Sequence, residues 1–129
     1  MQDDLEPVLE GVSRYFSLLA EPTRLRILHA ICSTEKSVTE IVEETGASQT
    51  NVSRHLGTLF SAGVLNRRKQ GNFIYYQVSD DTLIEICRTA CVHYASRSEP
   101  NEKRGSGAKA LARDFGARGK SAAAADPQS

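Results

Sequence analysis

The stretch Ser37–Gly63 reads SVTEIVEETGASQTNVSRHLGTLFSAG and is typical of two short helices joined by a tight turn. Ser37 and Glu40 have the spacing of a capping box, in which each side chain bonds to the other residue's backbone amide. A helix is therefore expected from Val38. Gly46 is expected to end this helix, because glycine adopts the left-handed conformation without a steric penalty.

The second helix of the pair is expected to follow Ser48, a good N-cap residue. One face is apolar and should pack inward, with Val52, Leu56, Leu59 and Phe60. The outward face carries hydroxyl, amide and guanidinium side chains in place of the usual Glu and Lys: Gln49, Thr50, Ser53 and Arg54. Such a face is typical of a helix that reads DNA. A surface helical hairpin is the alternative that the spacing alone leaves open.

Charge is distributed unevenly along the chain, although its 129 residues have a net charge of zero. No Asp or Glu occurs between Gly46 and Ser79, and the cations of this stretch include Arg54, Arg67, Arg68 and Lys69. An acid-free basic face suits contact with phosphates, and an ordinary solvated surface is the alternative.

Composition favours one compact domain with a small core, and a small core favours dimerisation. No apolar run approaches the roughly 20 residues that span a bilayer. The first residues, MQDDLEPVLE, are acidic where a secretory signal would be basic and then apolar. A cytoplasmic protein without a membrane partner is expected.

The flanking sequence predicts further helices and a hairpin. Helical spacing predicts a first helix from Glu6 or Pro7 to Leu19 and a second from Pro22 or Thr23 to about Ser33–Thr34. After Gly63 the period changes to that of strands. Two strands around a glycine-containing turn and a last helix are expected, at Val64–Lys69, Phe73–Val78 and from Ser79 or Asp80 to Tyr94.

Residues 1–98 are thus expected to form one DNA-binding and dimerisation domain. From about Glu99 the chain is rich in Gly, Ala, Ser and charge and has few large apolar side chains. We expect residues 99–129 to be a mostly disordered tail, because such a segment buries too little surface to offset the entropy of ordering.

Three motifs in this order resemble the ArsR/SmtB family of bacterial repressors over about Ser13–Arg97. They are LLAEPTRLRILHAI, SVTEIVEETGASQTNVSRHLGTLFSAGVL and RRKQGNFIYYQVSD. The resemblance implies a mainly α fold with a β-hairpin wing, a winged helix-turn-helix of order αααα-ββ-α. It also implies a homodimer through the first and last helices, no required cofactor and a repressor that an inducer releases from a pseudo-palindromic operator in double-stranded DNA.

Chemistry assigns expected roles at the DNA. Gln49 can address an adenine edge and Arg54 a guanine edge. Ser48, Thr50 and Ser53 can donate to phosphates or bases. His55 either touches phosphate or serves as a structural residue beside the turn. In the wing, backbone contacts that supply affinity without sequence choice are expected from Arg67, Arg68 and Lys69.

The chain has three cysteines, Cys32, Cys87 and Cys91. An odd number without an export signal argues against a disulfide scaffold. Some relatives of the resembled family sense oxidants or reactive sulfur species through one cysteine on the second helix and one on the last. Cys32 and Cys91 are the candidates here, each displaced by about one turn from the usual place, and a disulfide or polysulfide link between them is expected to release DNA.

Two alternatives for the cysteines stay open. Cys87 and Cys91 are spaced i and i+4 and, with Cys32, offer three thiolates to a soft metal or metalloid ion acting as inducer. The family's two best-known metal sites give no support. Residues 36–40 lack the thiolate motif, and only Asp81 and His93 fall near the other site, at imperfect spacing. The third possibility is that all three cysteines are core residues.

An enzyme is not expected. A small redox enzyme using Cys87, Cys91 and His93 would need exposed thiols beside a sizeable pocket. The chain is too short to add such a pocket to a DNA-binding core.

Overall fold

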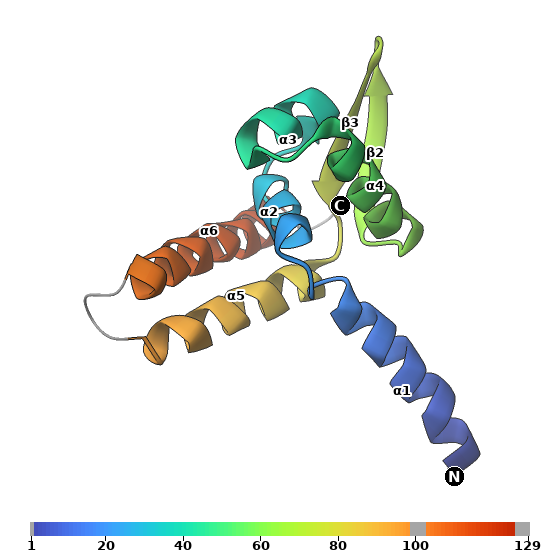
Figure 1. Ribbon diagram of the computed structural model, residues 1–129, viewed down its shortest axis with the longest axis vertical. Helices are drawn as coiled ribbons and strands as arrows, with labels where there is room; N and C mark the ends of the chain where they lie inside the picture. Colours follow the sequence, from blue (N-terminus) through green and yellow to red (C-terminus); the bar gives the residue numbers. More distant parts are fainter. Residues whose placement is uncertain (1, 99–102, 126–129) are drawn as a thin grey trace.

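The computed structural model describes residues 2–98 and 103–125 and contains six helices and three strands within them. In chain order the elements are α1 (Gln2–Ser17), α2 (Pro22–Ala30), β1 (Lys36–Ser37), α3 (Val38–Thr45), α4 (Gln49–Ser61), β2 (Leu65–Gln70), β3 (Phe73–Val78), α5 (Asp81–Ser96) and α6 (Lys103–Ala125). The predicted winged helix-turn-helix is confirmed (Figure 1). Within the described ranges, no helix combines the length and the apolar character needed to cross a bilayer.

The core lies where α2, α3, α4 and the hairpin meet. Its fully buried side chains recur at helical spacing along each helix, as in an amphipathic helix. They include Ile27, Leu28, Ile41, Val52, Leu56, Leu59 and Leu83, each at most 1% exposed. This core fixes the relative positions of α3 and α4.

The wing is a three-stranded antiparallel sheet in the order β1-β3-β2. The expected hairpin is present, and Gly71 has a φ of 63° in its turn. The two-residue strand β1 was not predicted. It pairs Lys36 with Tyr76 and Ser37 with Tyr75, and so joins the start of α3 to the sheet.

The prediction for the end of the second helix was wrong by several residues. Helix α2 stops at Ala30, and Ile31 is its C-cap with φ −115° and ψ 17°. Cys32 therefore lies in the loop after α2 and not on the helix. There its thiol donates a hydrogen bond to the carbonyl oxygen of His29 over 3.2 Å.

The expectation of a disordered tail is corrected for residues 103–125, which form helix α6. Figure 1 shows α6 running beside α5, and the two helices are in extensive contact. Ala108, Leu111 and Phe115 are spaced to share one face, and Ala108 and Phe115 are 7% and 2% exposed. This narrow stripe, together with many Ala, Lys and Arg residues of high helix propensity, outweighs the low average hydrophobicity. The remainder of the predicted tail lies outside the described residues.

Helix α1 projects away from the other helices (Figure 1). Its contact with them is concentrated at its end, where Leu18 is buried and the Tyr15 hydroxyl donates to Asp80 Oδ2 over 2.9 Å. Asp80 also caps α5, because its Oδ1 accepts from the Leu83 amide. One carboxylate thus connects α1 to the start of α5.

Candidate nucleic-acid interface and thiol sites

Helix α4 presents a polar face to solvent. Ser48 is the expected N-cap, and its Oγ accepts a hydrogen bond from the Asn51 amide over 3.1 Å. Val52, Leu56 and Leu59 hold the opposite face in the core. The exposed set contains all the predicted residues of this helix except His55: Ser48, Gln49, Thr50, Ser53 and Arg54.

Asn51 is an addition to this face that the sequence reasoning missed. It is exposed, and its Oδ1 accepts from Arg54 Nη2 over 3.4 Å. Its polar amide side chain, directly before the inward-facing Val52, could have indicated this exposed position. Asn51 therefore helps to orient the one guanidinium on the outer face of α4.

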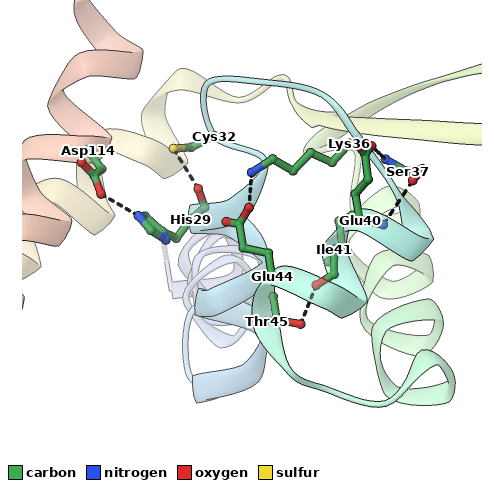
Figure 2. A network of polar contacts seen from close by, with 9 residues as sticks. All are labelled: His29, Cys32, Lys36, Ser37, Glu40, Ile41, Glu44, Thr45 and Asp114. Atoms are coloured by element: carbon green, nitrogen blue, oxygen red, sulfur yellow. Dashed lines mark hydrogen bonds and ion pairs between the residues drawn. The ribbon is translucent and has the colours of Figure 1, made fainter.

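Helix α3 is fixed at both ends, so it forms a rigid support for α4. Figure 2 shows the capping box: the Ser37 amide donates to Glu40 Oε1 over 2.8 Å, and the Glu40 amide donates to Ser37 Oγ over 3.2 Å. Gly46 ends the helix with φ 74°, in the left-handed region. Lys36 and Glu44 form an ion pair along the helix (Figure 2).

His55 is buried, unlike the other predicted residues of this helix. Its side chain is only 2% exposed, so it does not belong to the outer face of α4. Its Nε2 lies 2.6 Å from Glu21 Oε2, and its Nδ1 accepts from Arg24 Nε over 3.3 Å. Burial lowers the pKa of His55, which favours the neutral ring. His55 thereby ties α4 to the junction of α1 and α2.

The three wing cations have different surroundings. Arg68 pairs with Glu35, to which Nε donates over 2.8 Å, and its guanidinium lies 4.8 Å from the centre of the Tyr75 ring. Arg67 stacks over Phe60 at 3.9 Å. In the described part of the chain no carboxylate pairs with Lys69. Arg68 is therefore the most neutralised of the three.

The three thiols lie in the loop after α2 and on α5, away from the exposed face of α4. Cys32 and Cys87 are 2% and 4% exposed, whereas Cys91 is half-buried. Burial raises the pKa of Cys87 to about 12, with smaller contributions from Cys91 and Cys32, and burial also raises the pKa of Cys91. Cys87 thus lies within electrostatic range of both other cysteines, and its thiol is protonated at neutral pH.

A preformed metal site is absent from the part of the chain that the structure describes. No group of three His, Cys, Asp or Glu side chains there is arranged to hold a metal ion. The trithiolate alternative, Cys32, Cys87 and Cys91, is not assembled in this conformation, and neither is a site that includes Asp81 and His93.

Comparison with known proteins identifies the fold. The model of the family "Bacterial regulatory protein, arsR family" matches residues 21–67, which run from the Glu21 cap through α4 into the wing. A solved structure has a similar fold: the homodimeric winged helix-turn-helix DNA-binding domain Mb0332 from Mycobacterium bovis. It superposes on this chain with a TM-score of 0.64 at 26% sequence identity, and the match covers 77% of this chain and 95% of that one.

Two curated relatives extend the match. A "probable mercury resistance operon repressor" from Streptomyces lividans is 37% identical over 63% of this chain and 65% of its own length, just under two thirds. Rv0081, an "uncharacterized HTH-type transcriptional regulator" from Mycobacterium tuberculosis, is 33% identical over 66% of this chain and 75% of its own. These relatives are regulators and not enzymes, in agreement with the expectation from sequence. The chain belongs to the ArsR/SmtB family of winged helix-turn-helix transcriptional regulators.

Proposed function

We propose that the protein is a homodimeric transcriptional repressor that binds a specific operator through α4. The observation that carries the proposal is the exposed polar face of α4, which is backed by a buried apolar face and lacks carboxylates. Helices of this family type enter the major groove and contact base edges with their N-terminal residues. Gln49 and Arg54 are the proposed base readers, with Ser48, Thr50 and Ser53 as donors to bases or phosphates.

The wing supplies the proposed backbone contacts. The same role was predicted for Arg67, Arg68 and Lys69. Their different surroundings predict different contributions to DNA binding. Within the described ranges no carboxylate pairs with Lys69, so its charge is available to phosphates, whereas Arg68 must first break its ion pair with Glu35. Lys69 should therefore contribute most to the salt dependence of DNA binding, and Arg68 least.

The apolar face of α1 is the main evidence for a homodimer. Leu5, Val8, Leu9, Val12 and Phe16 are between 45% and 59% exposed, and they lie on a helix that stands away from the rest of the chain. Val92 and Tyr94 of α5 are similarly exposed. A second copy that covers these helices would place two α4 helices about one turn of DNA apart, roughly 34 Å.

DNA binding is tested with a duplex selected from a random library. Its affinity for the full chain is measured by fluorescence anisotropy across a salt series. Lys69→Ala should lower the slope of log affinity against log salt concentration by about one unit, with little change in sequence preference. Arg54→Ala should weaken binding to the selected duplex by about tenfold and relax the sequence preference of the protein. A flat salt slope for the unmodified protein would refute the proposal.

Dimerisation is tested separately by sedimentation. Val12→Asp places a carboxylate on the apolar face of α1 and should give monomers, while Ser13→Asp on the same helix is the matched control. Unchanged dimers in Val12→Asp, or monomers in the unmodified protein, would contradict the proposed role of α1.

For the inducer, we propose oxidation of thiols by a peroxide or a reactive sulfur species. Linking Cys32 to Cys91 removes two protons and two electrons, which the peroxide or polysulfide accepts. Cys91 is the only one of the three thiols that is not buried, so attack is expected to begin there. The raised pKa values of Cys87 and Cys91 imply a slow reaction in this conformation.

A thiophilic ion is the second candidate inducer, favoured by the name of the Streptomyces lividans relative. The i, i+4 pair Cys87 and Cys91 supplies two soft ligands on one helix face. Mass spectrometry after polysulfide, peroxide, Hg(II) or As(III), with DNA affinity measured on each form, separates the two. A bridged Cys32–Cys91 product with weaker DNA binding supports the thiol proposal. Full DNA affinity after all four treatments would refute both.

A further inference from the structure

An apolar pocket of about 340 Å³ opens between α2, α5 and α6. This volume is in the range of small-molecule sites. Its walls are mainly aliphatic and aromatic side chains and the two thiols of α5: Leu19, Pro22, Leu25, Ile86, Cys87, Ala90, Cys91, Leu111 and Phe115. Among the described residues that line it, Arg26 and His29 are the only charged or titratable ones apart from the thiols.

The wall contributed by α6 is anchored at one end. His29 Nε2 lies 2.9 Å from Asp114 Oδ2, as Figure 2 shows. The His29 ring also meets Phe115 edge-to-face, with 5.7 Å between the ring centres. Leu111, one turn earlier, remains 38% exposed although it lines the pocket. Leu111 is therefore the exposed part of this wall and Phe115 its buried part.

The charge around the pocket is unbalanced. The imidazole of His29 already has Asp114 as its partner, and the Cys87 thiol is protonated at neutral pH. Arg26 is exposed, and among the described residues no carboxylate pairs with it. The pocket thus combines an apolar interior with one unpaired cation at its edge. A guanidinium is well suited to a carboxylate, which it can bind with two parallel hydrogen bonds.

We infer that this pocket binds a small amphipathic carboxylate, whose apolar body lies between α2, α5 and α6 and whose carboxylate pairs with Arg26. The site requires neither DNA binding nor modification of the cysteines. It is separate from the exposed face of α4, so the inference stands or falls independently of the proposed operator site.

The test uses octanoate as the probe and octanol as its uncharged counterpart, each titrated into the full-length protein by calorimetry. Octanoate should bind saturably at one site per chain. Arg26→Gln should weaken the binding of octanoate by about tenfold and leave the affinity for octanol unchanged, because only octanoate forms charge-assisted hydrogen bonds with the guanidinium. Arg97→Gln is the matched control, since Arg97 is an exposed arginine at the end of α5 outside the pocket lining.

A second variant locates the apolar body. Ala90→Phe adds a ring to the pocket wall and should abolish binding of both probes while leaving the thermal unfolding transition in place. If that variant unfolds, Leu111→Trp on the facing wall gives the same comparison. Absence of saturable octanoate binding, equal losses in Arg26→Gln and Arg97→Gln, or full binding in the filled variant would each overturn the inference.

Discussion

The α3–α4 unit and the α5–α6 pair are held together in different ways. In the first, Ser37, Gly46 and Ser48 fix the helix ends, and the inner faces include the fully buried Ile41, Val52, Leu56 and Leu59. In the second, the buried Phe115 and one half-exposed ion pair hold α6 in place, and a pocket remains between the helices. The unit proposed to read DNA is therefore tightly packed, whereas the α5–α6 pair leaves a pocket lined by Cys87 and Cys91.

One histidine in each region illustrates the difference. His55 is 2% exposed and contacts Glu21 from within the α3–α4 side of the molecule. The side chain of His29 is 31% exposed, and its partner Asp114 is 47% exposed. Solvent screens an exposed pair, so the His29–Asp114 contact stabilises α6 only modestly. Loss of the Glu21 contact would deprive the buried Nε2 of His55 of its 2.6 Å partner, and such a loss in a buried site costs more than the loss of an exposed pair.

The largest expected effect is on the buried face of α4. Leu56→Ala removes a side chain that is 1% exposed and leaves a cavity, so the free energy of unfolding should fall by about 2–5 kcal/mol. Urea unfolding followed by circular dichroism measures this change. Leu111→Ala in α6 is the control, and a comparable loss there would erase the proposed difference between the regions.

A smaller effect is expected from Phe115→Ala, although it removes a larger side chain. Phe115 is 2% exposed, but α6 can detach while the core of α2, α3 and α4 stays intact, which limits the cost to local unfolding. Hydrogen exchange should show faster exchange in residues 103–117 and unchanged protection in α4. Simultaneous loss of protection in both helices would show that the molecule unfolds as one unit.

Sequence reasoning succeeds where local chemistry decides the structure. The Ser37–Glu40 capping box, the left-handed Gly46 and the Ser48 cap are recognisable because each works within a few neighbouring residues. The exposed face of α4 follows from those ends by helical periodicity. Only His55 was left undecided, because its partner Glu21 lies 34 positions away in the sequence.

The missed features depend on contacts between distant residues. Two residues of β1 carry no strand signal of their own, and they pair only because β3 lies beside them. Helix α6 has a weak apolar stripe that gains its stability from α5 and from His29, 85 positions before Asp114. The pocket between these helices was therefore not predictable from the sequence.

The next effect concerns His55 and pH. Burial lowers its pKa below the ordinary value of 6.5, Arg54 and Arg24 lower it further, and Glu21 opposes the shift. The unfolded chain binds this proton more readily than the folded one. The contribution of the neutral His55 ring to the free energy of unfolding is therefore fully present above pH 6.5. It is lost as the pH falls toward the folded pKa, by at most about 1.4 kcal/mol per pH unit.

His55→Asn should remove this part of the pH dependence. Its destabilisation relative to the unmodified protein should be largest near neutral pH and should shrink as the pH falls below 6.5. Urea midpoints across that range measure the difference, with the exposed His93→Asn as control. A constant difference at all pH values would show that His55 contributes packing alone.

The smallest expected change in stability distinguishes a serine that caps a helix from one that does not. Ser37→Ala removes the oxygen that accepts from the Glu40 amide and should cost about 1 kcal/mol. Ser106→Ala, on the exposed side of α6, replaces a serine with the best helix former and should change stability by no more than a few tenths of a kcal/mol, in the stabilising direction. Both are measured by urea unfolding. Equal losses would mean that helix propensity, and not the side-chain cap, holds the start of α3. An unequal result with the predicted signs would show that the α3–α4 unit owes its rigidity to hydrogen bonds that α6 lacks at this position.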